Sequence, residues 1–115
     1  MNQEVREYHK NDENGNPAGG YTEGVGIKIE WQNGPLGRGA ERREPSGAFV
    51  EGVLNAALGR LEFYQQSRFR CRENAIAITK IEEALHWLES RTHRREVAGI
   101  EGTHVEPVKV PPANL

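Results

Sequence analysis

The sequence predicts an α+β chain in which a small N-terminal β element precedes an antiparallel two-helix hairpin, assembled into a homo-oligomer. One stretch near the middle of the first half alternates apolar and polar side chains with period two, and two later stretches repeat apolar side chains at helical spacing. The 115 residues are only 36% hydrophobic and 7% aromatic, so one copy has little material for a core. A partner copy would supply the missing burial.

The β element is expected in residues 21–32, and it is the one convincing strand. Residues 1–20 are polar and end in a run of Asn, Gly and Pro, which predicts an arm or mobile loop. The strand's apolar face consists of Val25, Ile27, Ile29 and Trp31. Turn formers and arginines then make residues 33–45 a loop, which is expected to be solvated.

A first helix is expected from Ser46, whose hydroxyl can cap its first turn, and Glu51 suits the positive end of the helix dipole. Gly52 and Gly59 each weaken this helix by about 1 kcal/mol relative to alanine, which suggests close packing against another backbone. The apolar stripe consists of Val50, Val53, Leu54, Ala57, Leu58, Leu61 and Tyr64.

A second helix follows a short break at residues 66–72 and ends near Val97, because Gly99 suits the left-handed position after a helix. Its apolar stripe consists of Ala77, Ile78, Ile81, Ala84, Leu85 and Leu88. So short a connection makes the two helices antiparallel, and the strand is expected to cover one side of them. The domain therefore spans residues 21–106, and residues 107–115 form a Pro-rich tail.

Charge and cysteine content exclude several classes of protein. The formal charge of −2 argues against a general binder of genomic DNA or RNA, which must neutralise many phosphates. Cys71 is the single cysteine, so a reducing, cytoplasmic setting is expected, and a small buried thiol is its expected role. No apolar run approaches the roughly 20 residues that span a bilayer, and no signal peptide is expected because the first residues lack its apolar core.

One line of side chains on the second helix has two possible roles. Trp87, Arg91 and Arg95 recur every four residues and so share one face of the helix. Cations at a helix C-terminus complement the macrodipole, which is a purely structural role. Arginines can also act as planar forks for a phosphate or a base edge, a task for which guanidinium is better suited than ammonium.

The turn between the helices combines aromatic side chains with arginines. Phe63, Tyr64 and Phe69 lie there, and Arg72 is one of three arginines that interleave with them. Such a cluster can sandwich a purine, although Tyr64 also belongs to the core stripe and Phe69 could plug the end of the hairpin. Asn74 could cap the second helix or read adenine through its amide.

The sequence contains few combinations of residues that could catalyse a reaction, and we expect neither catalytic residues nor a cofactor. The sequence contains no Gly-rich phosphate loop and no His-Glu-x-x-His metal pair. The histidines lack metal-ligand spacing, so His104 is expected at the surface or against a ligand, and no metal is expected. An enzyme would need a general base in the pocket, for which Glu73 and Glu101 are the candidates.

Many separated segments share one resemblance to a known family. They are residues 34–35, 45–51, 60–65, 71–75, 83–85, 87–89, 91–92, 99 and 101–104. Together they resemble the phage Thoeris anti-defence sponge family, which shares a helical-hairpin domain with the phage sponges that counter CBASS. The resemblance extends over residues 21–106.

The resemblance implies a non-enzymatic protein that acts in the cytoplasm of the infected bacterial host. It would sequester a cyclic ADP-ribose isomer, made as a signal by bacterial TIR-domain proteins, without degrading it. The family forms dimers or hexamers with ligand pockets at subunit interfaces, and some members also hold cyclic oligonucleotides in separate pockets.

By position, the resemblance implies that Tyr64 or Phe63 stacks on adenine, that Asn74 reads a ligand edge, and that Arg91 and Arg95 hold the pyrophosphate. A second nucleotide pocket is placed near Arg42 and Arg43. Two other classes stay open: a small oligomeric helical module for phage structure or assembly, and an enzyme acting on the nucleotide.

Overall fold

The first part of the chain forms a three-stranded sheet. In the computed structural model, which describes residues 4–105, they are β1 (Arg6–Asn11), β2 (Pro17–Gly24) and β3 (Ile27–Trp31). They pair antiparallel in the order β1-β2-β3. Two helices follow this sheet, so the predicted α+β class is confirmed.

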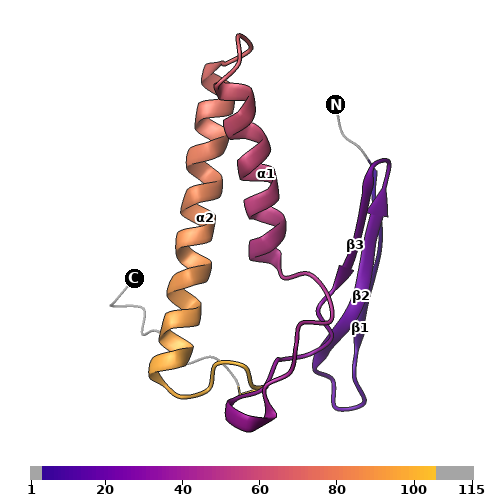
Figure 1. Cartoon of the computed structure of the whole chain (residues 1–115). Helices are drawn as coiled ribbons and strands as arrows, with labels where there is room; N and C mark the ends of the chain where they lie inside the picture. Colours follow the sequence, from indigo (N-terminus) through magenta and orange to yellow (C-terminus); the bar gives the residue numbers. More distant parts are fainter. Residues whose placement is uncertain (1–3, 106–115) are drawn as a thin grey trace.

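The helices α1 (Val50–Gln65) and α2 (Arg72–Val97) stand side by side as an antiparallel hairpin (Figure 1). A single 3-10 turn, η1 (Gly39–Glu41), lies in the loop before them. The end of α2 is as predicted, since Gly99 has a φ of +74°. Within residues 4–105, no helix combines the length and apolar character needed to cross a membrane.

The prediction of an arm or loop at residues 1–20 is wrong for residues 6–20, which form β1 and the first half of β2. A tight turn joins these strands, because the Asp12 carboxylate accepts hydrogen bonds from the backbone N–H groups of Asn14 (2.9 Å) and Asn16 (3.0 Å). Gly15 completes the turn at a φ of +80°. Polar composition concealed these strands, because β1 is exposed along its whole length and needs no apolar face.

The single strand predicted at residues 21–32 is also wrong, because the segment reverses direction within it. Gly24 pairs with Ile27 across a two-residue turn, and Gly26 adopts the φ of +75° that such a turn requires. Val25, counted in the apolar face, sits in this turn with 83% of its surface exposed. The predicted segment therefore contains the end of β2, a turn and β3, and the alternation that remains, Ile27, Ile29 and Trp31, lies within β3.

The predicted cap of α1 is wrong as well. Phe49 occupies the N-cap position without a side-chain hydrogen bond. Ser46 instead accepts a hydrogen bond from the Asn33 backbone N–H (3.1 Å), while the Gln32 side chain accepts from the Ser46 and Gly47 N–H groups (2.7 and 3.2 Å). These contacts hold residues 46–48 beside the end of β3, which delays the start of the helix. Glu51 lies in the first turn as predicted.

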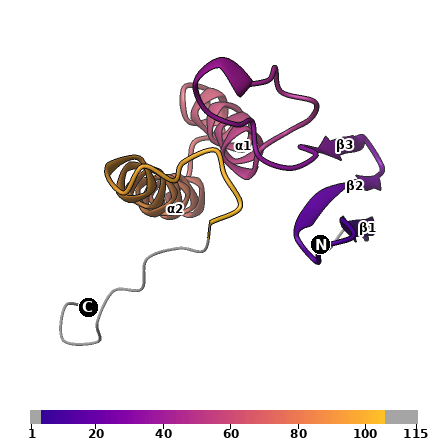
Figure 2. The ribbon, with the colours of Figure 1, turned by 90° about the horizontal axis from the view of Figure 1, so that it is seen from below.

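The sheet lies beside α1, on the side away from α2, and does not cover the hairpin as predicted (Figures 1 and 2). The radius of gyration is 17.1 Å, against about 13 Å for a compact chain of this length. Among residues 4–105 no apolar side chain is fully buried. The hairpin stripes meet each other, yet most of their side chains stay half-buried, and Val50, Ala57 and Tyr64 are exposed.

Thr22 is the most enclosed polar side chain of the sheet, with 7% of its surface exposed. Its hydroxyl accepts a hydrogen bond from the Trp31 indole N–H (2.9 Å) and donates one to the Glu7 carboxylate (3.2 Å). We expect Thr22→Val to lower the free energy of unfolding by about 1–2 kcal/mol, because both partners lose a hydrogen bond. Urea unfolding at fixed protein concentration measures this.

The control is Thr79→Val, which removes one hydrogen bond to the Ala75 carbonyl on an exposed helix face. It should change the free energy of unfolding by no more than about 0.5 kcal/mol. Equal losses in the two variants would contradict a specific role for Thr22.

Candidate functional site

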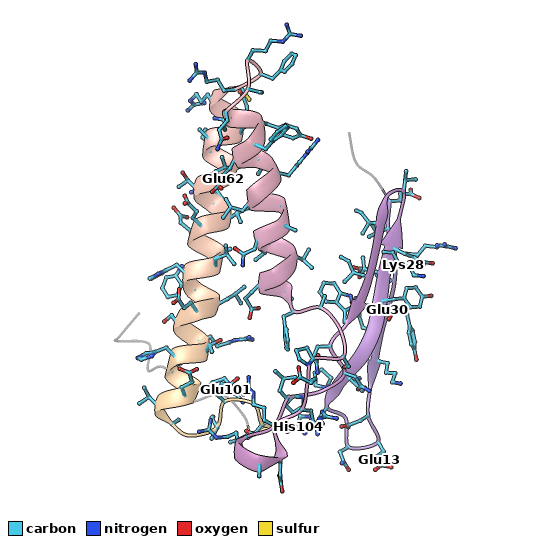
Figure 3. All side chains as sticks on the ribbon, in the orientation of Figure 1. Glu13, Lys28, Glu30, Glu62, Glu101 and His104 are labelled. Carbon is cyan, nitrogen blue, oxygen red and sulfur yellow. The ribbon has the colours of Figure 1, made fainter. Side chains whose placement is uncertain are left out.

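The predicted ligand-binding residues fall into two groups at opposite ends of the hairpin. We call the group at the turn between the helices the tip cluster; it consists of Phe63, Tyr64, Phe69, Arg72 and Asn74. The other group lies at the far end of α2, which we call the base, and consists of Arg91, Arg95 and His104. Figure 3 shows His104 and Glu101 at this base, far from Glu62 near the tip.

The two groups do not meet within one chain. Asn74 and Arg91 are separated by 17 positions of one helix. At a rise of about 1.5 Å per residue, this places them about 25 Å apart along the axis. A ligand in one chain can touch one group only, so a pocket that uses both groups needs two copies of the chain.

Within the tip cluster, the rings of Phe63 and Tyr64 lie beneath one guanidinium, that of Arg60. The Arg60 guanidinium carbon lies 4.9 Å from the ring centroids of both Phe63 and Tyr64, and its Nε donates to the Tyr64 hydroxyl (3.1 Å). Phe63 is 57% exposed and Tyr64 38% exposed. Tyr64 therefore lies at the edge of the hairpin packing. Arg60 was missed by the sequence analysis.

The turn that carries this cluster is fixed by the Gln65 side chain. Its Nε2 donates to the Cys71 carbonyl (3.0 Å), and its Oε1 accepts from the Cys71 N–H (2.9 Å). Cys71 occupies the N-cap position of α2, so Asn74 is not the cap and lies half-buried in the first turn. The Cys71 thiol is exposed, which corrects the prediction of a buried thiol.

At the base, two adjoining open clefts of about 420 and 310 Å³ lie between the sheet, the start of α1 and the end of α2. We call them together the base cleft. Six residues line both parts: Pro35, Phe49, Glu51, Arg91, Arg95 and Thr103. Trp31 and His104 line the larger part. The cleft thus combines aromatic rings, cations and the first turn of a helix, where backbone N–H groups lack helical partners.

Arg91 and Arg95 differ in how their guanidiniums are used. Arg95 donates to three backbone carbonyls, those of Val105 (3.0 Å), Ile100 (3.2 Å) and Thr103 (3.1 Å). Arg91 is exposed and lines the cleft, and among the described residues no hydrogen bond or ion pair engages its side chain. The arginine best placed for an anion is therefore Arg91.

Arg42 and Arg43 hold the loop at the base. The Arg42 guanidinium pairs with the Glu101 carboxylate (3.1 Å), and Arg43 donates to the Pro35 carbonyl (2.6 Å). Arg42 also lines the smaller part of the cleft. Glu101, a candidate general base, is engaged in this ion pair, whereas Glu73 lies in the first turn of α2 at the opposite end of the molecule.

His104 lies close enough to the β1–β2 turn to influence Asp12. Backbone hydrogen bonds, chiefly from Asn16, lower the pKa of the Asp12 carboxyl below its usual value, and the charge of His104 acts in the same direction.

Residues 4–105 contain no cluster of three or more His, Cys, Asp or Glu side chains able to hold a metal ion.

Trp31, Pro35 and Phe49 were not predicted from the sequence as parts of the base cleft. Trp31 ends β3 and Phe49 precedes α1, and a parallel bridge between Trp31 and Ala48 sets these two segments side by side. The N-cap position of Phe49 became known only from the structure, because the sequence favoured Ser46 as the cap.

Comparison with known proteins identifies the hairpin. A family model described as the Acb2/Tad1 hairpin domain matches residues 23–92, which include β3, α1 and most of α2. A protein named Thoeris anti-defense 1, from Bacillus phage SBSphiJ7, is 45% identical over 76 residues. That match covers 66% of this chain and 51% of the relative, so the chain spans about half the relative's length. The chain belongs to the Acb2/Tad1 hairpin-domain family.

Proposed function

We propose that this protein is a phage anti-defence sponge that binds a cyclic ADP-ribose isomer and holds it intact, which blocks Thoeris immunity in the cytoplasm of the infected host. Family membership and the name of the relative support an anti-defence role. The observation that supports nucleotide binding is the base cleft, where the unengaged Arg91 stands beside aromatic rings.

The chemistry of the cleft matches an anionic ligand with a planar base. Arg91 can give a bidentate contact to a phosphate, and Phe49 and Trp31 offer apolar ring surface. The Glu51 carboxylate supplies an acceptor for a ribose hydroxyl or a base amine. We therefore propose that the protein acts by binding and not by bond cleavage.

The complete pocket, in this proposal, forms between two copies of the chain packed with their hairpins antiparallel. Such packing brings the tip cluster of one copy to the base cleft of the other, so that Tyr64 or Phe63 can stack on the base while Arg91 holds the pyrophosphate. On α1, Val50, Ala57 and Tyr64 belong to the apolar stripe yet are exposed in a single chain. Open space also surrounds Gly52 and Gly59. A second copy packed on the stripe would cover its three exposed side chains, while the two glycines lie on the opposite face of α1.

Dimers of this kind could combine into a hexamer, and a second pocket near Arg42 and Arg43 would take the cyclic oligonucleotides of CBASS. This extension rests on the resemblance alone, because both arginines already hold loop contacts. Titration of a cyclic dinucleotide into the wild type and into the Arg43→Ala variant tests this second pocket separately.

Tyr64→Ala should weaken binding of a cyclic ADP-ribose isomer by about tenfold to a hundredfold, because base stacking of roughly 1–3 kcal/mol is lost. Isothermal titration measures the change, and the melting temperature must be recorded because Tyr64 borders the hairpin packing. Tyr8→Ala is the matched control, since Tyr8 is an exposed tyrosine on the sheet. Unchanged affinity in folded Tyr64→Ala would transfer the stacking role to Phe63 or Phe69.

Purification from bacteria that carry an active TIR-domain signalling enzyme tests the proposal in the cell. Mass spectrometry of the heat-released small molecules should find a cyclic ADP-ribose isomer at near-stoichiometric amount. A protein that carries no nucleotide from such cells would instead support the structural or assembly module.

A further inference from the structure

We propose that Arg95 is a positioning residue: it fixes residues 99–105 to the end of α2, beside the loop at 35–43, and so sets one wall of the base cleft. The inference rests on the proposed function for its ligand but on the contacts of Arg95 for its mechanism. It assigns the contact with the anion to Arg91 and the shape of the cleft to Arg95.

The Arg95 guanidinium sits inside the curve of the segment that follows α2. One terminal nitrogen donates to Val105, and the other donates to Ile100 and Thr103. These carbonyls span the whole turn, and the Thr103 hydroxyl adds a contact to the Ile100 carbonyl (2.5 Å). A planar fork with fixed donors can hold three carbonyls at once, whereas the point charge of a lysine cannot reproduce this geometry.

A close backbone contact ties the same segment to the loop before α1. The Gly37 N–H donates to the Gly102 carbonyl (2.9 Å). A Cβ on Gly102 would lie 2.6 Å from the Gly37 oxygen, and the φ of Gly102 is +78°. Only glycine fits at position 102, because a larger residue would be strained and would also push the two backbone segments apart.

Two arginines from the loop reinforce the contact. Arg38 donates to the Glu101 carbonyl (3.0 Å), and Arg42 pairs with its carboxylate (3.1 Å). Residues 99–105 are thus held from α2 by Arg95 and from the loop by Arg38, Arg42 and Gly37. We call this set of contacts the base latch.

The base latch matters to ligand binding because Thr103 and His104 line the cleft and belong to the latched segment. Their positions depend on Arg95, although Arg95 directs its donors to carbonyl oxygens. Loss of the latch should therefore weaken binding while Arg91 stays in place. The two arginines of one helix face then have separable roles.

Two substitutions break the latch from opposite sides. Arg95→Lys keeps the charge and removes the fork, whereas Gly102→Ala changes no charge and separates the segment from Gly37. Both should raise hydrogen exchange at the amides of residues 99–105 at least tenfold in the protein without ligand. Both should also weaken binding of a cyclic ADP-ribose isomer at least fivefold. The double variant should be no worse than the poorer single variant, because both act on one set of contacts.

Arg94→Lys, one residue earlier on the exposed face, is the control and should leave both measurements unchanged. Unchanged hydrogen exchange in Arg95→Lys would overturn the proposal. Weaker binding in Arg95→Lys with wild-type binding in Gly102→Ala would overturn it too, because Arg95 would then contact the ligand directly. If the wild type binds none of the isomers, the proposed function fails, while the exchange data still decide whether the latch exists.

Discussion

Arg91→Ala is expected to weaken binding of a cyclic ADP-ribose isomer by about a hundredfold, equivalent to about 2.7 kcal/mol. The reason is that Arg91 lines the base cleft with no partner among the described residues, so its loss leaves the pyrophosphate without a charge-assisted contact. The melting temperature should stay nearly constant, because Arg91 is exposed in the single chain. Isothermal titration with a panel of isomers measures the effect.

Arg91→Lys separates a specific fork from a simple charge. A lysine preserves the favourable interaction with the C-terminal end of the helix dipole but loses bidentate geometry, so affinity should still fall at least tenfold, or about 1.4 kcal/mol. Arg94→Lys, near the same helix end, should bind as the wild type does. Unchanged affinity in Arg91→Lys would show that the residue contributes only a positive charge and would contradict the bidentate contact.

Ala57→Glu is expected to convert the proposed oligomer to a 12.9 kDa monomer. Ala57 is exposed in the single chain and lies on the part of the α1 stripe that α2 leaves uncovered. Alanine and glutamate are both good helix formers, so the hairpin itself should tolerate the change. An unpaired charge in a buried interface costs on the order of 3 kcal/mol, which weakens association by roughly a hundredfold or more.

Sedimentation velocity across the micromolar range measures this change, and circular dichroism checks the helices. Ser90→Glu is the control, because it adds the same charge to an exposed small residue of α2. A wild type that is monomeric throughout this range would contradict the proposed pocket between copies. An Ala57→Glu oligomer of wild-type size would move the interface to another face, of which the open side of Gly52 and Gly59 is the first candidate.

The helices were predictable because their apolar side chains recur with a period that no strand shares. The half-buried residues of α2 include all six members of its predicted stripe. The end at Val97 followed from Gly99, whose positive φ the structure confirms. The start of α1 was not predictable from capping chemistry, because Ser46 is drawn into contacts with Gln32 and Asn33 that lie far away in sequence.

The strands β1 and β2 were harder to predict, because they lack the alternation of apolar and polar side chains that usually marks a strand. β1 has no buried side chain, and its pairing depends on the Asp12 turn rather than on an apolar face.

The candidate site was only partly predictable, because the sequence does not show which of its residues lie close together. The sequence pointed to residues near both ends of α2, but Asn74 and Arg91 lie about 25 Å apart along this continuous helix and cannot meet in one chain.

Recovery of intact nucleotide after denaturation tests the central claim most directly. The purified protein is incubated with a stoichiometric amount of a cyclic ADP-ribose isomer, unbound ligand is removed, and the protein is heated before mass spectrometry of the released molecules. We predict that the added isomer returns with unchanged mass and chromatographic retention, at close to the bound amount, even after long incubation. Linear ADP-ribose or any other conversion product would contradict sequestration and indicate an enzyme.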